Sequence, residues 1–225
     1  MSNIKVMLSA AFKEADLELL PAFERDSGHK VENVMVPSVQ MMSRLKGGEI
    51  VDLVILSAAS LEELRNTGIV TDRTDLAKSG IGVAVKSGAP RPDISSGEAV
   101  KRAVLAAKGI AYSTGPSGLY LVGLFQRMGI AEEIKHKVTQ TLGQPSGGVV
   151  ARGEAEIAFQ QVSELLPVPG IELVGPLPPD IQEITVFSAG LHAKAPAPDA
   201  ARSLVKFLKA PQAAPVIRNK GMEPA

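Results

Sequence analysis

The residues best suited to chemistry lie in one stretch, GIAYSTGPSGLYLVGL, at positions 109–124. A short apolar strand is followed by Ser113 in a turn, and then by Ser117 and Gly118 at the start of a helix. A helix N-terminus presents unpaired backbone N–H groups and the positive end of the helix dipole, and neighbouring hydroxyls add donors. The stretch therefore predicts a site for a small anion. An ordinary capped turn would use the same residues.

Other polar residues at predicted strand ends are candidates for the same site. Gln160 and Gln161 follow the apolar segment EIAF, and a polar pair is costly to bury there without partners, which favours a position in a cleft. Ser57 ends an apolar strand and either contacts the ligand or caps the next helix. Tyr112 either lines the pocket or packs in the core, and Lys13 either neutralises an anion or is solvated.

The composition excludes several kinds of site. The chain of 225 residues has a formal net charge of zero and no cysteine, which excludes thiol catalysis, disulfides and thiolate metal sites. The three histidines are far apart and lack zinc-ligand spacing, so no metal and no cofactor are predicted. Balanced charge and scarce aromatic residues argue against nucleic-acid binding. Neither a Ser-His-Asp pattern nor paired carboxylates are recognisable, so the catalytic residues are unknown.

Apolar segments alternate with helical patterns along the chain, which predicts an α/β fold with doubly wound, mainly parallel sheets. Strands are predicted over residues 4–9, 31–36, 52–56, 81–85, 110–112, 156–159, 171–174 and 185–191. Helices are predicted over residues 12–27, 38–46, 61–66, 97–107, 117–128, 132–142, 160–165, 199–209 and 212–220. Pro21 is expected to kink or split the first helix. Ser60 and Glu63 are expected to cap the third.

Two strands divide the chain into two lobes. The strands at 81–85 and 185–191 bracket a segment with βα elements of its own. We therefore expect two Rossmann-like lobes with a central cleft, residues 1–80 plus 192–225 and residues 81–191. They would be joined by hinge strands near 81–86 and 185–191. Such a cleft would be lined by the carboxyl ends of strands.

Four sequence blocks carry a resemblance to a known family. They are AFERDSGHKV, GGEIVDLVILSAASLEELRNTGIV, YSTGPSGLYLVGLFQRMGI and RGEAEIAF, which begin at residues 22, 47, 112 and 152. With them the chain resembles the type II periplasmic solute-binding proteins, in particular the molybdate-binding branch. The resemblance implies the periplasmic binding protein type II fold, closure of two lobes around a small anion, and a monomer without cofactor. It also implies an ABC permease as partner if the protein is exported.

The resemblance places the family's anion site on four turns of this chain. The corresponding residues are Ser9, Ala10 and Ala11; Ser38; Ser117 and Gly118; and Gln160 with Gln161. Molybdate binders usually have a serine where this chain has Ala11, and often a tyrosine where it has the two glutamines. The differences favour a carboxylate or small organic acid over molybdate, since amides both donate and accept hydrogen bonds.

The same branch also resembles the aconitate isomerases, cofactor-free allylic isomerases of tricarboxylic acids. An allylic proton shift needs an acid/base, for which Lys13, Tyr112 and Glu164 are the candidates. Isomerase is therefore the alternative to binding protein, and an intracellular sensor module is a third interpretation. The N-terminal residues MSNIKVMLSA lack a leader, which predicts a cytoplasmic protein as written, or a periplasmic one if a leader was removed. No apolar run is long enough for membrane insertion.

Overall fold

The computed structural model describes all 225 residues and divides into two compact units. Unit 1 comprises Met1–Ser79 and Thr185–Ala225, and unit 2 comprises Gly80–Ile184. Strand β9 (Ile184–Leu191) therefore belongs almost entirely to unit 1, whereas the sequence analysis assigned it to the second lobe. The reason is its antiparallel pairing with β3 (Leu53–Ser57). None of the helices is both long enough and apolar enough to cross a membrane.

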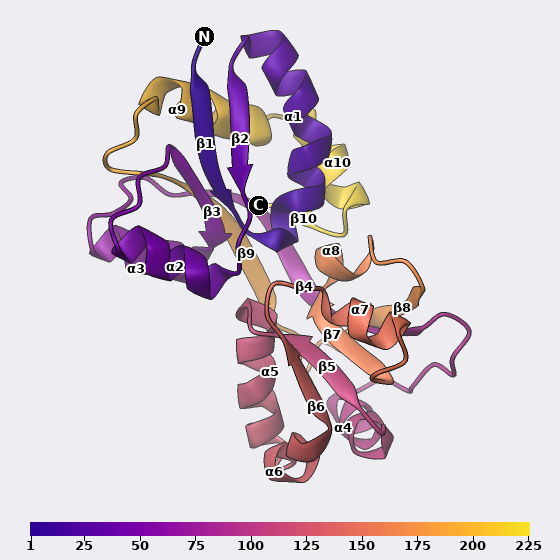
Figure 1. The fold of residues 1–225 in the computed structure, drawn as a ribbon. Coiled ribbons are helices and arrows are strands. Elements are labelled where there is room, and N and C mark those ends of the chain that lie inside the picture. Colours follow the sequence, from indigo (N-terminus) through magenta and orange to yellow (C-terminus); the bar gives the residue numbers. More distant parts are fainter. The chain divides into compact units, whose positions relative to one another are not determined.

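Unit 1 is a mixed sheet with helices on both faces (Figure 1). Strand β1 (Asn3–Leu8) pairs in parallel with β2 (Lys30–Val34) and β3. The first half of β4 (Thr74–Lys86) pairs antiparallel with β10 (Glu223–Pro224). The helices of unit 1 are η1 (Ala10–Phe12), α1 (Lys13–Ser27), α2 (Ser38–Lys46), α3 (Ala58–Asn66), α9 (Pro198–Leu208) and α10 (Ala213–Asn219).

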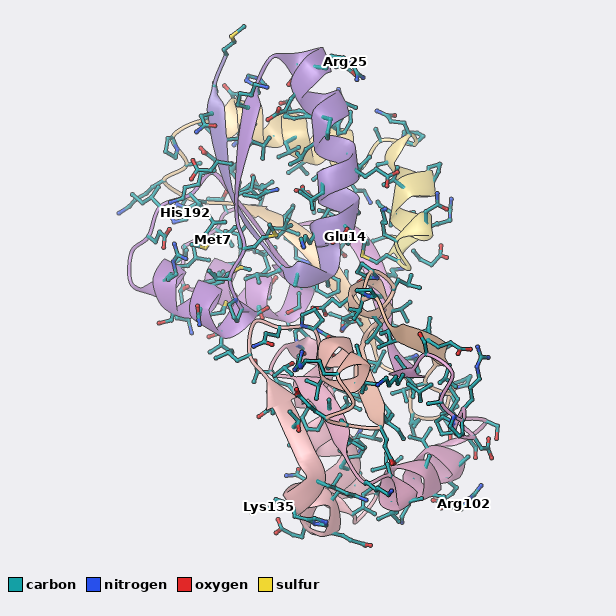
Figure 2. The ribbon with its side chains drawn as sticks, turned by 45° about the vertical axis from the view of Figure 1, so that its right-hand side comes forward. Met7, Glu14, Arg25, Arg102, Lys135 and His192 are labelled. Atoms are coloured by element: carbon teal, nitrogen blue, oxygen red, sulfur yellow. The ribbon has the colours of Figure 1, made fainter.

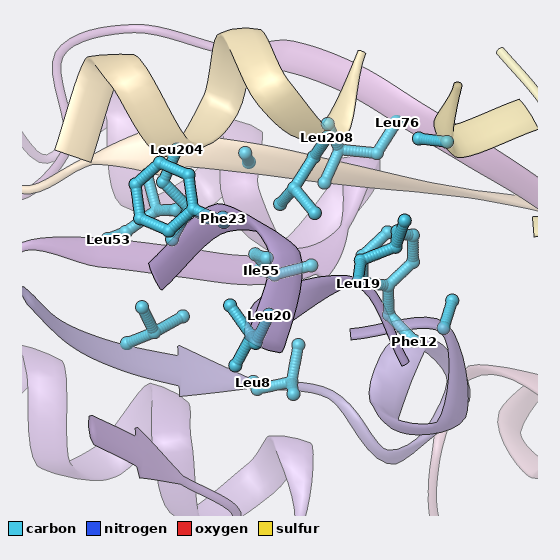
Figure 3. Close-up of a cluster of buried hydrophobic side chains, with 14 of the residues drawn as sticks. Leu8, Phe12, Leu19, Leu20, Phe23, Leu53, Ile55, Leu76, Leu204 and Leu208 are labelled. Atoms are coloured by element: carbon cyan, nitrogen blue, oxygen red, sulfur yellow. The ribbon is translucent and has the colours of Figure 1, made fainter. Parts of the chain in front are cut away.

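The alternation of side chains along β3 explains why this strand is apolar throughout. Leu53 and Ile55 belong to the core cluster formed with α1, α9 and α10, part of which Figure 3 shows. Val54 and Leu56 belong to a second cluster on the other face, formed with α2 and α3. Because successive side chains of a strand point to opposite faces, a strand covered on both faces is apolar at every position.

Unit 2 has the same design around a smaller sheet. Strand β5 (Ile110–Ser113) pairs in parallel with β6 (Val138–Thr141) and with β7 (Ile157–Gln161). The second half of β4 pairs antiparallel with β7 and with β8 (Ile171–Pro176). The helices are α4 (Gly97–Ala106), α5 (Pro116–Arg127), α6 (Ala131–Ile134), η2 (Lys135–Lys137), α7 (Ser146–Ala151) and α8 (Val162–Leu165).

Several details differ from the sequence predictions. The helix predicted over residues 132–142 is instead α6 and η2 followed by strand β6, which gains its hydrogen bonds from β5. Helix α1 is not split at Pro21, which is exposed to solvent. Helix α3 begins one turn earlier than predicted: its N-cap is Ser57, whose Oγ accepts a hydrogen bond from the backbone N–H of Ser60.

Candidate ligand-binding site

The polar turns of unit 2 follow three neighbouring parallel strands. Ser113 and Thr141 are paired at the ends of β5 and β6, and β7 ends at Gln161. Helices α5, α7 and α8 follow these strands. Because the carboxyl ends of parallel strands meet at the same edge, the turns gather there, where ligands bind in many α/β proteins. We call this region, residues 113–118, 141–147 and 160–164, the carboxyl edge of unit 2.

Helix α5 begins directly against the end of β5. Gly118 makes this contact possible, because a Cβ atom at this position would lie 1.5 Å from the carbonyl oxygen of Ser113. Ser117, one residue earlier, is buried with 1% exposure, and its Oγ has no hydrogen-bond partner. The helix start thus combines free backbone N–H groups with a hydroxyl that is free to donate.

Two further buried hydroxyls at the carboxyl edge also lack a partner. They are Thr141 Oγ1, at the end of β6, and Ser163 Oγ, in α8. An unsatisfied buried polar group costs about 1–3 kcal/mol and calls for an explanation. All three hydroxyls can donate to the oxygens of an anion, which makes a ligand at this edge a coherent explanation.

A hydrogen-bonded chain connects α7, β7 and α8 at the same edge. The Oε1 of Gln160 accepts from the backbone N–H of Ser146 at 2.7 Å and lies 2.9 Å from the Ser146 Oγ. Its Nε2 donates to Glu164 Oε1 at 2.9 Å. The orientation of the amide follows from this arrangement, since the backbone N–H can only donate and must face the oxygen.

Glu164 is the only ionisable side chain in the carboxyl edge of unit 2. Burial raises the pKa of its carboxyl from 4.5 to about 7, and the hydrogen bond from Gln160 opposes this shift only in part. Near neutral pH both protonation states are therefore populated. Cationic side chains lie elsewhere in unit 2: Lys135 precedes the amino end of β6, and Arg102 projects from α4 (Figure 2). Binding at this edge would depend on neutral donors and on the helix dipole.

In unit 1, the predicted residues also follow the carboxyl ends of parallel strands. Ser9 follows β1, and its backbone N–H donates to Ile55 at 2.9 Å. Ala10 is exposed and Ala11 is buried in η1. Ser38 is the half-buried first residue of α2, and no side chain caps that helix.

Three of the sequence candidates contact other residues of their own unit. The Oγ of Ser57 caps α3 and donates to Ser60 Oγ at 3.0 Å. Lys13 Nζ lies 3.4 Å from Glu14 Oε1 on a partly exposed side chain. Tyr112 packs in the core of unit 2, with its ring 6.1 Å from that of Phe125, and burial raises the pKa of its hydroxyl.

Sequence reasoning missed Thr141, Ser146 and Ser163. Thr141 was missed because the sequence predicted a helix over residues 132–142, whereas Thr141 ends strand β6. Ser146 could have been found, because the triplet Pro-Ser-Gly at 116–118 recurs at 145–147. It also missed a polar pair in unit 1, in which the half-buried Asn33 donates from Nδ2 to Oδ2 of the buried Asp16 at 2.5 Å.

Comparison with known proteins defines the class. Residues 4–223 match the bacterial extracellular solute-binding protein family, and the chain belongs to it. The chain has the α/β fold of type II periplasmic binding proteins: the periplasmic molybdate-binding protein of Azotobacter vinelandii superposes with a TM-score of 0.79 at 19% identity, over 97% of this chain and 98% of that one.

Two curated relatives differ in the function that their names state. An aconitate isomerase from Pseudomonas sp. is 37% identical over 232 residues, covering 100% of this chain and 88% of the relative. The molybdate-binding protein ModA of Azotobacter vinelandii is 25% identical, covering 98% of this chain and 89% of the relative.

Proposed function

We propose that this solute-binding protein recognises a small organic acid in preference to molybdate or another tetrahedral oxyanion. The set of three buried, unpartnered hydroxyls of Ser117, Thr141 and Ser163 carries the proposal that an anion binds at the carboxyl edge of unit 2. A carboxylate offers about four acceptor positions on two oxygens, which suits several neutral donors. The start of α5 supplies the positive dipole end in place of a cation.

The replacements at the family's anion site support the same ligand class. Ala11 cannot donate the side-chain hydrogen bond of the serine usual in molybdate binders, and Gln160 and Gln161 stand where a tyrosine is frequent. The relative at 37% identity is named an aconitate isomerase, and its substrate class, a polycarboxylic acid, is consistent with the proposed ligand class.

Movement of the two units is part of this proposal. The chain passes from one unit to the other after Ser79 and after Ile184. The neighbouring segments 81–86 and 185–191 are proposed as the hinge that lets the units close on the ligand. Ser9, Ala10, Ala11 and Ser38 would then contribute from unit 1. If the protein is exported, it would deliver the ligand to an ABC permease.

A second function, isomerisation of a small polycarboxylic acid without a cofactor, is favoured by two observations. One is the similarity to aconitate isomerase along the whole chain. The other is Glu164, a partly buried carboxyl at the carboxyl edge whose pKa of about 7 suits both removal and return of a proton.

A thermal-shift panel tests the proposed ligand class. It would contain cis- and trans-aconitate, citrate, succinate, molybdate, tungstate, sulfate and phosphate at equal ionic strength. A ligand that binds only the folded state raises the melting temperature. We expect stabilisation by carboxylic acids and none by the oxyanions. Stabilisation by molybdate or tungstate alone would refute the proposal.

A further inference from the structure

We infer that Glu164 is the acid/base of this protein, and that its carboxylate moves a proton between two carbon atoms of a bound unsaturated polycarboxylic acid. The inference rests on the proposed function, because it requires that an organic acid binds at the carboxyl edge of unit 2. It specifies the chemical step in which Glu164 acts and the residues that position its carboxyl.

The position of Glu164 is the first argument. It lies in α8, three residues after the end of β7, and it is the only ionisable side chain among the three turns of the carboxyl edge. The other candidates are unsuitable: Lys13 is paired with Glu14, and the buried hydroxyl of Tyr112 has a raised pKa that disfavours its deprotonation. Proton transfer at this edge therefore depends on Glu164.

The hydrogen bonds of Glu164 are the second argument. Gln160 Nε2 donates a hydrogen bond to Glu164 Oε1 at 2.9 Å, and Gln160 Oε1 accepts one from the backbone N–H of Ser146. Gln160 and Ser146, which are buried with 3% and 0% exposure, are thus positioning residues. The second oxygen, Oε2, has no hydrogen-bond partner, and Glu164 is half-buried. A carboxylate held at one oxygen and unpaired at the other can accept a proton there, as a general base must.

The chemical step balances without a cofactor. Glu164 Oε2 removes a proton from a CH₂ group next to a ligand carboxylate, and the C–H electron pair forms a new C=C bond. The pair of the original C=C bond shifts to the far carbon, which takes the proton back from Glu164. One C–H bond breaks, another forms, and Glu164 returns to its initial state. Between the two proton transfers, negative charge builds up on the ligand carboxylate. Hydroxyl donors such as Ser117 and Thr141 would stabilise that charge.

The test is proton exchange measured by ¹H NMR in D₂O, with cis- and trans-aconitate as probes. Wild-type protein is expected to interconvert the two and to exchange their CH₂ and vinyl protons for deuterium. In Glu164→Gln, both rates should fall at least about 100-fold, because loss of a general acid/base typically costs 10²–10⁴. The dissociation constant of trans-aconitate, measured by calorimetry, should change by less than about fivefold, since the amide keeps the shape and one acceptor.

A matched control is Glu154→Gln, which replaces an exposed glutamate of unit 2 that pairs with Arg152 and lies outside the carboxyl edge. It should retain the wild-type rates. If Glu164→Gln does not fold, as judged by circular dichroism, Glu164→Asp keeps the carboxyl and should retain slower turnover, while Glu164→Ala should regain exchange with added formate. Near wild-type rates in Glu164→Gln would overturn the inference.

Different results would refute the role of Glu164 and the proposed binding function. If aconitate binds to wild-type protein and no carbon-bound proton exchanges, the role of Glu164 is refuted and the proposed binding function stands. If no carboxylic acid binds, the proposed function is refuted and the role of Glu164 with it.

Discussion

The α-carbon of Gly118 lies so close to the carbonyl oxygen of Ser113 that a methyl group on it would stand 1.5 Å from that oxygen. This contact joins the first turn of α5 to the end of β5 and fixes the helix start at the carboxyl edge of unit 2. The atom in the way belongs to the backbone, so the strain cannot be relieved by a side-chain rotation.

Gly118→Ala should therefore displace the start of α5. We expect a loss of stability of about 3 kcal/mol, because overpacking typically costs about 1–3 kcal/mol and the obstructing atom here belongs to the backbone. Affinity for the organic acid should fall at least about tenfold. Urea unfolding and calorimetry measure both.

The control for this variant is Gly115→Ala, at the N-cap of the same helix. Its φ of −76° is accessible to alanine, and the nearest atom to a Cβ would be Ser113 Oγ at 3.4 Å. Such a change is expected to be neutral or to stabilise by up to about 1 kcal/mol. Equal effects of the two substitutions would contradict the role assigned to the contact of Gly118.

Ser117→Ala and Thr141→Val remove unpartnered buried hydroxyls and should separate binding from stability. The melting temperature should stay constant or rise, because a desolvated group without a hydrogen bond is removed. Affinity for the organic acid should fall about tenfold for each variant, the equivalent of one hydrogen bond of about 1.4 kcal/mol.

Ser96→Ala is a control that should lower stability and leave affinity unchanged, the opposite of the effects expected for Ser117→Ala and Thr141→Val. The Oγ of Ser96 caps α4 by accepting from the backbone N–H of Ala99 at 3.2 Å. Its loss should cost about 1 kcal/mol of stability with no change in affinity. The ligand role of the hydroxyls would be disproved by unchanged affinity in both Ser117→Ala and Thr141→Val.

The buried Asp16, which accepts a hydrogen bond from Asn33, should make the stability of unit 1 depend on pH. Burial raises the pKa of Asp16 from 3.8 to about 6, with partial opposition from the hydrogen bond of Asn33. The folded protein therefore holds the proton more tightly than the unfolded chain. The free energy of unfolding should fall by roughly 3 kcal/mol as the pH rises from about 4 to about 6.

Asp16→Asn should remove this dependence and raise stability at pH 7. The new amide can accept from Asn33 Nδ2, and its own NH₂ group can donate to Asn33 Oδ1, a buried atom without a partner in the wild type. Urea unfolding between pH 4 and pH 8 measures the effect. The matched variant Asp26→Asn, at an exposed residue, should follow the wild-type curve. Parallel curves for Asp16→Asn and wild type would contradict this account.

Gln160→Met should disrupt the hydrogen bonds that connect Ser146, Gln160 and Glu164 at the carboxyl edge of unit 2. Methionine is similar in size, but it leaves the backbone N–H of Ser146 unpaired in a buried position, which should cost about 1–3 kcal/mol. The hydrogen bond from Gln160 lowers the pKa of Glu164, so its loss should move that pKa upward. A ¹³C NMR titration of the glutamate carboxyls would detect the change. An unaltered titration of Glu164 would show that Gln160 does not position it.

Most elements of the fold could be predicted because their signals are local. The uninterrupted apolar run of β3 indicates a strand covered on both faces, and Gly28 ends α1 in the left-handed conformation that glycine favours. Strand β6 could not be predicted in this way. Thr139 and Gln140 are exposed, and the strand exists because it pairs with β5, a contact between residues far apart in sequence.

The places of the candidate residues in the fold could be predicted, whereas their hydrogen bonds could not. Ser117 and Gln160 lie at the carboxyl edge of unit 2, as the spacing of strand and helix suggested. Ser57 and Ser117 both look like helix caps in the sequence, yet the first caps α3 and the second has no partner. That difference depends on how each helix packs against the strand before it. Such packing involves residues far apart in the sequence, so the residues around each serine do not reveal it.

Isothermal titration calorimetry of trans-aconitate and of molybdate with the same preparation decides between an organic acid and an oxyanion as the ligand. We expect saturable one-to-one binding of trans-aconitate, weakened in Ser117→Ala, and no heat of binding with molybdate. One-to-one binding of molybdate without any binding of trans-aconitate would contradict this expectation.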